Sequence, residues 1–230
     1  QRADFRAEAI VDRGALGSSF YCVMPMERMR LELPLPGRHL ISSALAALAA
    51  ASVWGIGASE AQRVFPGLRA SAMRGELLRF DDGAAILNDC YNSSPAALAA
   101  AIELLAATPD FRRRILAAGE MLELGPASPG LHREAGRTAA QTGRVDWIFG
   151  VQGEAAQIIE GAVEAGFPRT RTKHFASSAE AAEFLTGFLE PGDLLLVKGS
   201  RGVKMEQIVE AVLARRTPLP ATVPNSEEHH

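Results

Sequence analysis

Ala84-Ala85-Ile86-Leu87-Asn88-Asp89 is an apolar run that ends in a carboxylate, and it leads directly into the polar turn Cys90-Tyr91-Asn92-Ser93-Ser94-Pro95. A second run, Leu194-Leu195-Leu196-Val197, leads in the same way into Lys198-Gly199-Ser200-Arg201-Gly202. Continuous apolar runs are typical of parallel strands that are buried on both faces. In an open α/β sheet, ligands bind beyond the carboxyl ends of such strands. The two runs therefore predict an α/β sheet whose strand ends bind a phosphorylated or carboxylated small molecule.

From about Met73 the chain alternates between strand-length and helix-length segments. The predicted strands cover residues 76–80, 84–89, 114–118, 147–151, 171–175 and 194–198, and the predicted helices cover residues 95–107, 129–142, 154–165, 179–189 and 203–215. Ser94-Pro95 and Ser128-Pro129 each place an N-cap hydroxyl before a first-turn proline. With right-handed crossovers, this pattern predicts a Rossmann-like, doubly wound, mostly parallel sheet over residues 73–216.

The part before this sheet reads differently. Short β-rich segments at residues 5–11, 18–24 and 29–33 are followed by helical segments at 39–53 and 59–65. Three strands and two helices form no complete core, so residues 1–72 are interpreted as the tail of a larger domain whose beginning is absent. Residues 217–230 hold three prolines and no periodicity, and we expect them to be disordered.

Composition excludes several classes of protein. The formal net charge of -3 offers no attraction to nucleic acid or to an anionic membrane, and no run approaches the ~20 apolar residues of a membrane span. The first residues lack the apolar core of a signal peptide. With only Cys22 and Cys90, a disulfide scaffold is not expected. We therefore expect a cytoplasmic protein. A monomer is a separate expectation, which the composition does not decide.

Four strings in this order resemble motifs of the Mur ligase family. They are Asn88 to Pro95, Gly119-Glu120-Met121-Leu122-Glu123-Leu124-Gly125, His132, and Val197-Lys198-Gly199-Ser200-Arg201. The resemblance covers about residues 1–213 and is strongest to the type that joins D-alanyl-D-alanine to UDP-N-acetylmuramoyl-tripeptide. It implies an ATP-dependent acid–amino-acid ligase of peptidoglycan precursor synthesis that uses Mg2+. It also identifies residues 1–72 as the end of the central ATP-binding domain and residues 73–216 as the acceptor-binding domain.

On the nucleotide side, the resemblance implies four contacts. Asp89 would accept hydrogen bonds from ribose hydroxyls, Arg74 would reach the ATP phosphates, and Asn92 and His39 would also contact the nucleotide. Each residue also has a structural interpretation. Asp89 and Asn92 suit a turn before a proline-initiated helix, and Arg74 suits a solvated hinge.

On the acceptor side, Lys198, Ser200 and Arg201 precede a predicted helix that starts near Val203. Because helix N-termini attract anions and Arg can grip a carboxylate at two points, we predict an anion site there. The resemblance assigns this loop to the carboxylate of D-alanyl-D-alanine, and Tyr91 could orient that ligand or hold its own turn. The alternative for the loop is a solvent-facing basic turn.

The remaining polar residues of the motifs suggest no metal site and no catalytic side chain. Glu120 and Glu123 lack a third ligand at useful spacing, so solvated or capping roles are expected. His132 is interpreted as a structural hydrogen-bonding residue. Cys90 could be a catalytic thiol, but a small, half-buried residue at a strand end is the preferred interpretation because reactivity needs an activating neighbour.

Departures from the family pattern matter for nucleotide binding. Where the family has G-x-H-N-x-x-N-A, this chain has Leu40 and Ser43 at the two Asn positions, and neither side chain can make an amide's paired contacts. The sequence also contains no G-x-x-G-K-[ST] phosphate loop. We therefore expect the 230-residue chain to be inactive alone. The alternative function is a non-catalytic ligand-binding module, whereas a nicotinamide enzyme would need a glycine-rich turn after Asp89.

Overall fold

The structure, a computed structural model, describes residues 3–220 and divides into two compact units. The first unit contains Gln1–Ala70 and the second is Ser71–Leu219. The division falls two residues before the expected one between residues 72 and 73. Within residues 3–220, none of the helices combines the length and the apolar character that crossing a lipid bilayer requires.

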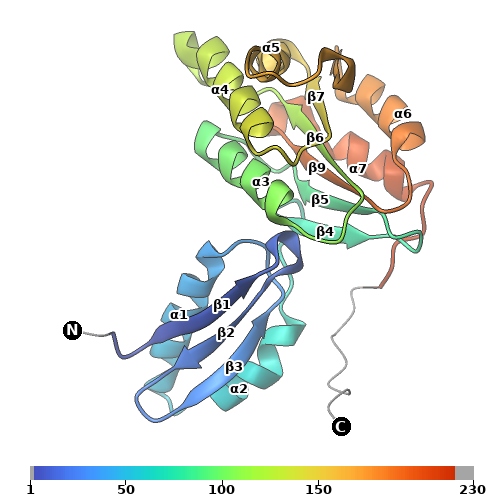
Figure 1. Ribbon diagram of the computed structural model, residues 1–230. Coiled ribbons are helices and arrows are strands. Elements are labelled where there is room, and N and C mark those ends of the chain that lie inside the picture. Colours follow the sequence, from blue (N-terminus) through green and yellow to red (C-terminus); the bar gives the residue numbers. More distant parts are fainter. Residues whose placement is uncertain (1–2, 221–230) are drawn as a thin grey trace. The chain divides into compact units, whose positions relative to one another are not determined.

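The first unit is a three-stranded antiparallel sheet with two helices (Figure 1). Its strands are β1 (Arg6–Asp12), β2 (Ser18–Val23) and β3 (Arg28–Leu33), and its helices are α1 (His39–Ser52) and α2 (Ala58–Val64). Alternate residues of β2 and β3 are buried, including Phe20 and Leu31, as period-two side-chain alternation requires. The helix α1 buries Ile41, Ala44 and Leu48, which share one face at helical spacing.

The second unit is built on a six-stranded sheet with the order β4-β5-β9-β6-β7-β8. Its strands are β4 (Glu76–Arg79), β5 (Ala85–Asp89), β6 (Arg113–Gly119), β7 (Trp147–Val151), β8 (Thr172–Phe175) and β9 (Asp193–Lys198). Only β4 runs antiparallel to its neighbour. All six residues of β9 are buried, as expected of a central parallel strand. The prediction of an α/β, mostly parallel sheet is confirmed.

Helices cover both faces of this sheet. They are α3 (Pro95–Ala107), α4 (Ser128–Gln141), α5 (Ala156–Glu164), α6 (Ser178–Phe188) and α7 (Glu206–Leu213). Figure 1 shows α3 and α4 on one face of the sheet and α6 and α7 on the other. The apolar residues of α6 and α7 form one core cluster with Ile86, Ile115 and Phe149 of the strands. The chain is therefore doubly wound, as the segment order predicted.

Two glycines allow α4 and α5 to pack backbone against backbone. A Cβ atom built at Gly136 would lie 1.9 Å from the carbonyl oxygen of Ile158, and one at Gly161 would lie 2.0 Å from the carbonyl oxygen of Arg133. Both distances are far below any real Cβ contact, so only glycine fits at either position. This contact fixes the position of α4, which carries His132.

Three sequence expectations are corrected by the fold. Ser128 does not cap α4, because a 3-10 turn at Gly125–Ala127 precedes it and makes Ser128 the first helical residue. The helix α7 starts at Glu206 rather than near Val203, because Lys204 adopts a left-handed conformation with φ 59°. Residues 217–219 are not disordered, since Pro218 bridges Phe80 in antiparallel fashion. The remainder of the expected tail, residues 221–230, lies outside the described residues.

Candidate functional site

Three strands of the second unit end side by side. The strands β5, β9 and β6 are parallel neighbours, with Asp89 paired to Lys198 and Lys198 paired to Ala118. The strands β5 and β6 lead to α3 and α4 on one face of the sheet, whereas β9 leads to α7 on the other (Figure 1). Such a reversal of winding direction is where open α/β sheets bind their ligands. The three loops predicted from the sequence therefore meet at one sheet edge.

Lys198 lies inside this edge and not on its surface. Its side chain is 4% exposed, and its ammonium group donates to Asp89 Oδ2 at 2.6 Å and to the backbone oxygen of Asn92 at 2.9 Å. Two of the three ammonium donors are thus engaged by one loop. The alternative of a solvent-facing basic turn does not hold for Lys198.

Arg201, three residues further along the chain, is exposed. Its guanidinium lies 3.6 Å from a carboxylate oxygen of Glu206 and 3.6 Å from the sulfur of Met73, and its side chain is 60% exposed. The predicted helix N-terminus beside it is not there, since α7 begins further along and places the acidic Glu206 in its first turn. Any anion selectivity at this loop must therefore come from the Arg201 guanidinium itself.

Tyr91 lies between two arginines. The guanidinium carbon of Arg74 is 3.9 Å from the centre of the Tyr91 ring, and that of Arg201 is 5.9 Å from the same centre. Both distances fall within the range of attractive cation–π contacts. Within residues 3–220, Arg74 forms no ion pair. An exposed guanidinium held by a ring and facing no acid is ready to bind an anion.

Asn92 holds its own turn. Its side-chain oxygen accepts from the backbone N–H of Ser93 at 2.8 Å, while its backbone oxygen accepts from Lys198. The next residue, Ser94, caps α3 by accepting from the N–H of Ala97. The prediction of an N-cap at Ser94 is confirmed, and the geometry favours the turn interpretation for Asn92.

Ser200 connects the loop after β9 to the loop after β6. Its hydroxyl accepts from the N–H of Leu122 at 2.9 Å, and its own N–H donates to the backbone oxygen of Glu120 at 3.1 Å. The residue is 4% exposed. Ser200 therefore fixes the two loops relative to each other, and its hydroxyl is already engaged.

His132 and Glu120 both stabilise the loop after β6. The Nε2 atom of His132 accepts from the N–H of Met121 at 2.9 Å, so its Nδ1–H donates to the backbone oxygen of Ser128 at 2.8 Å. The His132 side chain is fully buried, and its structural interpretation is confirmed. Glu120 accepts from the N–H of Glu154 at 3.1 Å, which is a capping contact. No cluster of three His, Cys, Asp or Glu residues that could hold a metal ion occurs among residues 3–220.

Cys90 is fully buried. Burial, with the nearby Glu206 carboxylate as the next cause, raises the pKa of its thiol to about 12. Its Sγ lies 2.9 Å from Asn88 Oδ1, and the amide nitrogen of Asn88 donates to Glu76 at 3.0 Å. A catalytic thiol needs a depressed pKa and access to substrate, so the structural interpretation of Cys90 is supported.

The sequence did not reveal the partners of these motif residues. Met73, Glu76 and Glu206 lie outside the recognised motifs, yet each contacts a motif residue. Glu206 offered one signal, an acid five residues after Arg201 at the start of a helical segment. Met73 offered none, because its contact with Arg201 spans 128 residues of sequence.

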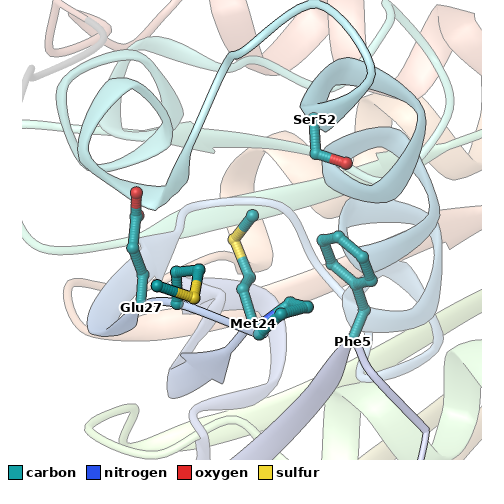
Figure 2. Close-up of a pocket in the computed structure, with 6 residues that line it drawn as sticks. Phe5, Met24, Glu27 and Ser52 are labelled. Carbon is teal, nitrogen blue, oxygen red and sulfur yellow. The ribbon is translucent and has the colours of Figure 1, made fainter.

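His39 belongs to the first unit, so the fold of the second unit does not bring it to the sheet edge. It is the exposed first residue of α1, and its ring lies against the backbone of Gly37. A shallow apolar hollow of about 250 Å³ also lies in the first unit (Figure 2). It is lined by Phe5, Met24, Pro25, Met26, Glu27 and Ser52. The charged residue there is Glu27, whose carboxylate accepts from the N–H of Ala58 at 2.8 Å and so caps the start of α2.

Known proteins resemble this chain over most of its length. The glutamate ligase domain of Mur ligases matches residues 73–201. The UDP-N-acetylmuramoyl-tripeptide--D-alanyl-D-alanine ligase of Bacillus subtilis is 34% identical over 79% of this chain and 39% of its own length. The ligase of the same name from Escherichia coli is 31% identical over 85% of this chain and 42% of its own length.

Solved structures of Mur ligases also resemble this chain in fold. A crystal structure of MurF from Acinetobacter baumannii matches with a TM-score of 0.80 and 25% identity, covering 94% of this chain and 46% of that one. MurF of Thermotoga maritima, solved with ADP, shares the fold with a TM-score of 0.68 at 20% identity, covering 92% of this chain and 46% of that one. This chain spans about two fifths of the length of the curated relatives. Since the matched domain covers more than half of its residues, the chain belongs to the Mur ligase family.

Proposed function

We propose that this chain is the C-terminal part of an ATP-dependent ligase that adds D-alanyl-D-alanine to UDP-N-acetylmuramoyl-tripeptide in the cytoplasm. The observation that carries the proposal is that the three motif loops meet at the edge of the sheet where the winding direction reverses. Asp89, Arg74 and Arg201 belong to or contact these loops. The named relatives in Bacillus subtilis and Escherichia coli carry this activity in their names. In this proposal the first unit ends the ATP-binding domain, and the second unit binds the acceptor.

The nucleotide side of the site is assigned to Asp89, Arg74, Asn92 and His39. Only Oδ2 of Asp89 is engaged by Lys198, and a carboxylate has further acceptor capacity for ribose hydroxyls. Arg74, which forms no ion pair with the residues that the structure describes, offers its guanidinium to phosphate oxygens, and its stacking on Tyr91 restricts its motion. Asn92 acts by holding the turn. The assignment of His39, which belongs to the first unit, rests on the resemblance alone.

The acceptor side is assigned to Arg201, Tyr91 and Ser200, and the resemblance also places Lys198 on this side. Arg201 is the exposed cation of the loop, and its planar fork matches the carboxylate of D-alanyl-D-alanine. Tyr91 is 45% exposed and presents its ring next to that guanidinium. Ser200 contributes by fixing the loop, because its hydroxyl already accepts from Leu122.

ATP and Mg2+ belong to the complete enzyme in this proposal. The printed sequence has no Gly-rich Lys-Ser/Thr phosphate loop, and residues 3–220 gather no three side chains that could hold a cation by themselves. The magnesium would be held by nucleotide phosphates and by residues upstream of this chain. We therefore propose that the 230-residue chain, acting as a monomer, has no ligase turnover alone.

The second candidate function is a non-catalytic binding module. The residue that favours this candidate is Leu40. The residue stands where the family has an Asn, and its side chain packs against the buried cluster of the first unit. Its neighbour Ser43 is exposed and shorter than the family's second Asn. A module of this kind would keep the acceptor loops and lose the contact with the nucleotide base.

The test uses the extended protein, which is this chain together with whatever its own reading frame encodes upstream. Phosphate release that requires UDP-N-acetylmuramoyl-tripeptide, D-alanyl-D-alanine and Mg·ATP together supports the ligase. Arg201→Gln should raise the KM for D-alanyl-D-alanine by ten-fold or more, since a charged hydrogen-bonding partner is lost. An extended protein that binds the dipeptide in calorimetry but neither binds nor hydrolyses ATP would establish the module instead.

A further inference from the structure

We propose that Lys198 is a positioning residue that holds residues 89–92, the segment assigned to the nucleotide. In this proposal Lys198 is not a ligand for the acceptor carboxylate. The inference rests on the proposed function and deepens it, because it moves one cation of the Lys198–Arg201 loop from the acceptor side to the nucleotide side. It begins from burial. The Lys198 residue is 3% exposed, whereas the Arg201 side chain is 60% exposed.

Within residues 3–220, the hydrogen bonds of the Lys198 side chain reach one loop, residues 89–92. The ammonium group donates to Asp89 at the start of residues 89–92 and to Asn92 at the end of the same segment. One buried cation thus fixes both ends of the segment, and Tyr91 between them projects to the surface with 45% of its area exposed. A buried ammonium that already has a carboxylate partner gains little from a second anion, because it would have to give up the first.

The two hydrogen bonds of the Lys198 ammonium, called the clamp below, also orient the Asp89 carboxylate that the nucleotide would contact. Oδ2 of Asp89 is held at 2.6 Å by Lys198, which restricts the rotation of a carboxylate that is 26% exposed. Groups held in advance lose less freedom when a ligand binds. Loss of the ammonium should therefore weaken nucleotide binding through Asp89 and leave the acceptor carboxylate, which meets Arg201, nearly unaffected.

The chain contains a matched control on the same strand. The strand β9 begins with the fully buried Asp193 and ends with Lys198. Asp193 pairs with Arg113 of the neighbouring β6, with an Nε to Oδ1 distance of 2.8 Å. Both are charge pairs that join β9 to an adjacent strand, but the Arg113–Asp193 pair lies at the opposite end of the strands from the site.

The experiment compares Lys198→Met with Arg113→Met in the extended protein. We expect Lys198→Met to raise the KM for ATP about ten-fold and to change the KM for D-alanyl-D-alanine less than two-fold, the size of effect expected when one charged contact is lost. Arg113→Met should lower the melting temperature and leave both KM values unchanged. In an Asp89→Asn background, Lys198→Met should add little further loss of ATP affinity, since the two groups act as one unit.

Three results would overturn the proposal. The first is a rise in the dipeptide KM with a constant ATP KM, which would make Lys198 an acceptor ligand. The second is a proportional change of both KM values, which would leave it a merely structural residue. The third concerns the 230-residue chain itself, where Lys198→Met and Asp89→Asn should be non-additive in urea midpoints, while Arg113→Met and Asp89→Asn should add. Additivity of the first pair would exclude the clamp even if the extended protein had no ligase activity, so the two proposals can fail separately.

Discussion

Replacing Gly136 by alanine tests the close contact of α4 with α5. A Cβ atom there would lie 1.9 Å from the backbone oxygen of Ile158 and 2.8 Å from the backbone nitrogen of Ala162. Backbone atoms cannot rotate away as the end of a side chain can. The helices must therefore separate by about 1.1 Å to restore even the 3.0 Å below which real Cβ contacts essentially do not occur. A shift of that size weakens the dispersion contacts between the two helices by roughly a quarter to a half.

The magnitude follows from two opposing effects. Overpacking costs about 1–3 kcal/mol, and a clash with fixed backbone atoms belongs at the upper end of that range. Alanine regains up to about 1 kcal/mol of helix propensity relative to glycine. We expect the Gly136→Ala variant to lose about 2 kcal/mol of unfolding free energy, which corresponds to a fall in melting temperature of about 4–8 °C for a unit of this size.

The control is the same substitution earlier in the same helix. A Cβ atom at Gly130 meets no heavy atom within 4 Å, so Gly130→Ala should be neutral or stabilising by up to about 1 kcal/mol. Urea unfolding is followed by the fluorescence of Trp147 after Trp54→Phe, because the chain has two tryptophans and only Trp147 lies in the second unit. Equal midpoints for the two alanine variants would refute the backbone contact.

Three further predictions concern single residues of the sheet edge. His132→Leu leaves the buried N–H of Met121 without an acceptor, so the unfolding free energy should fall by about 1–3 kcal/mol, and amide exchange at Met121 should accelerate while the rest of the sheet keeps its protection. Cys90 should not react with a thiol reagent at pH 8 unless the chain unfolds, because the pKa of its thiol is raised to about 12. As the unfolded thiol ionises near pH 9, the stability advantage of the chain over Cys90→Ala should be constant below that pH and shrink by at most about 1.4 kcal/mol per pH unit between pH 9 and 12; a constant difference would contradict the burial of the thiol. Ser94→Ala removes the cap of α3 and should cost about 1 kcal/mol in urea unfolding, whereas an unchanged midpoint would mean that the cap contributes nothing.

The positions of strands and helices could be predicted because the signals are local. The predicted helix at residues 95–107 has the same bounds as α3, where a capping serine and a proline mark the start. The sequence Ser177-Ser178-Ala179-Glu180 has the spacing of a capping box, but only half of the box forms, because the Glu180 carboxylate accepts from the N–H of Ala176. Strand order was not predictable in the same way. The insertion of β9 between β5 and β6 depends on which faces the later helices cover.

The site was predicted as a set of loops but not as a set of contacts. The local sequence around Lys198 is the same whether its ammonium faces solvent or a buried carboxylate. Its partner Asp89 lies 109 residues away, and no local periodicity reports on such a pair. The expected helix start at Val203 was wrong for a backbone reason, since the left-handed Lys204 interrupts the turn before α7.

The structure explains one departure from the family pattern, the asparagine at position 88. Asn88 stands where the family motif has its first Asp, and such a departure by itself would suggest weakened nucleotide binding. Asn88 faces Glu76 across the antiparallel pair β4–β5 and donates its amide to that carboxylate at 3.0 Å. An aspartate at this position would oppose Glu76 with a like charge in a buried place, where the mutual repulsion raises the energy of both groups.

Asn88 therefore suits its position opposite Glu76, because a neutral amide can donate to the carboxylate and adds no like charge. The side-chain oxygen of Asn88 also accepts a hydrogen bond from the Cys90 thiol. Asn88 therefore joins β4, β5 and the start of the loop in one network. Because the substitution is matched by its neighbour, it does not count against a nucleotide site at Asp89. Only Leu40 and Ser43, both in the first unit, still favour a binding module over a ligase. Restoring asparagine at these two positions in the extended protein should raise ATP affinity if the ligase assignment holds, and an unchanged affinity would favour the module.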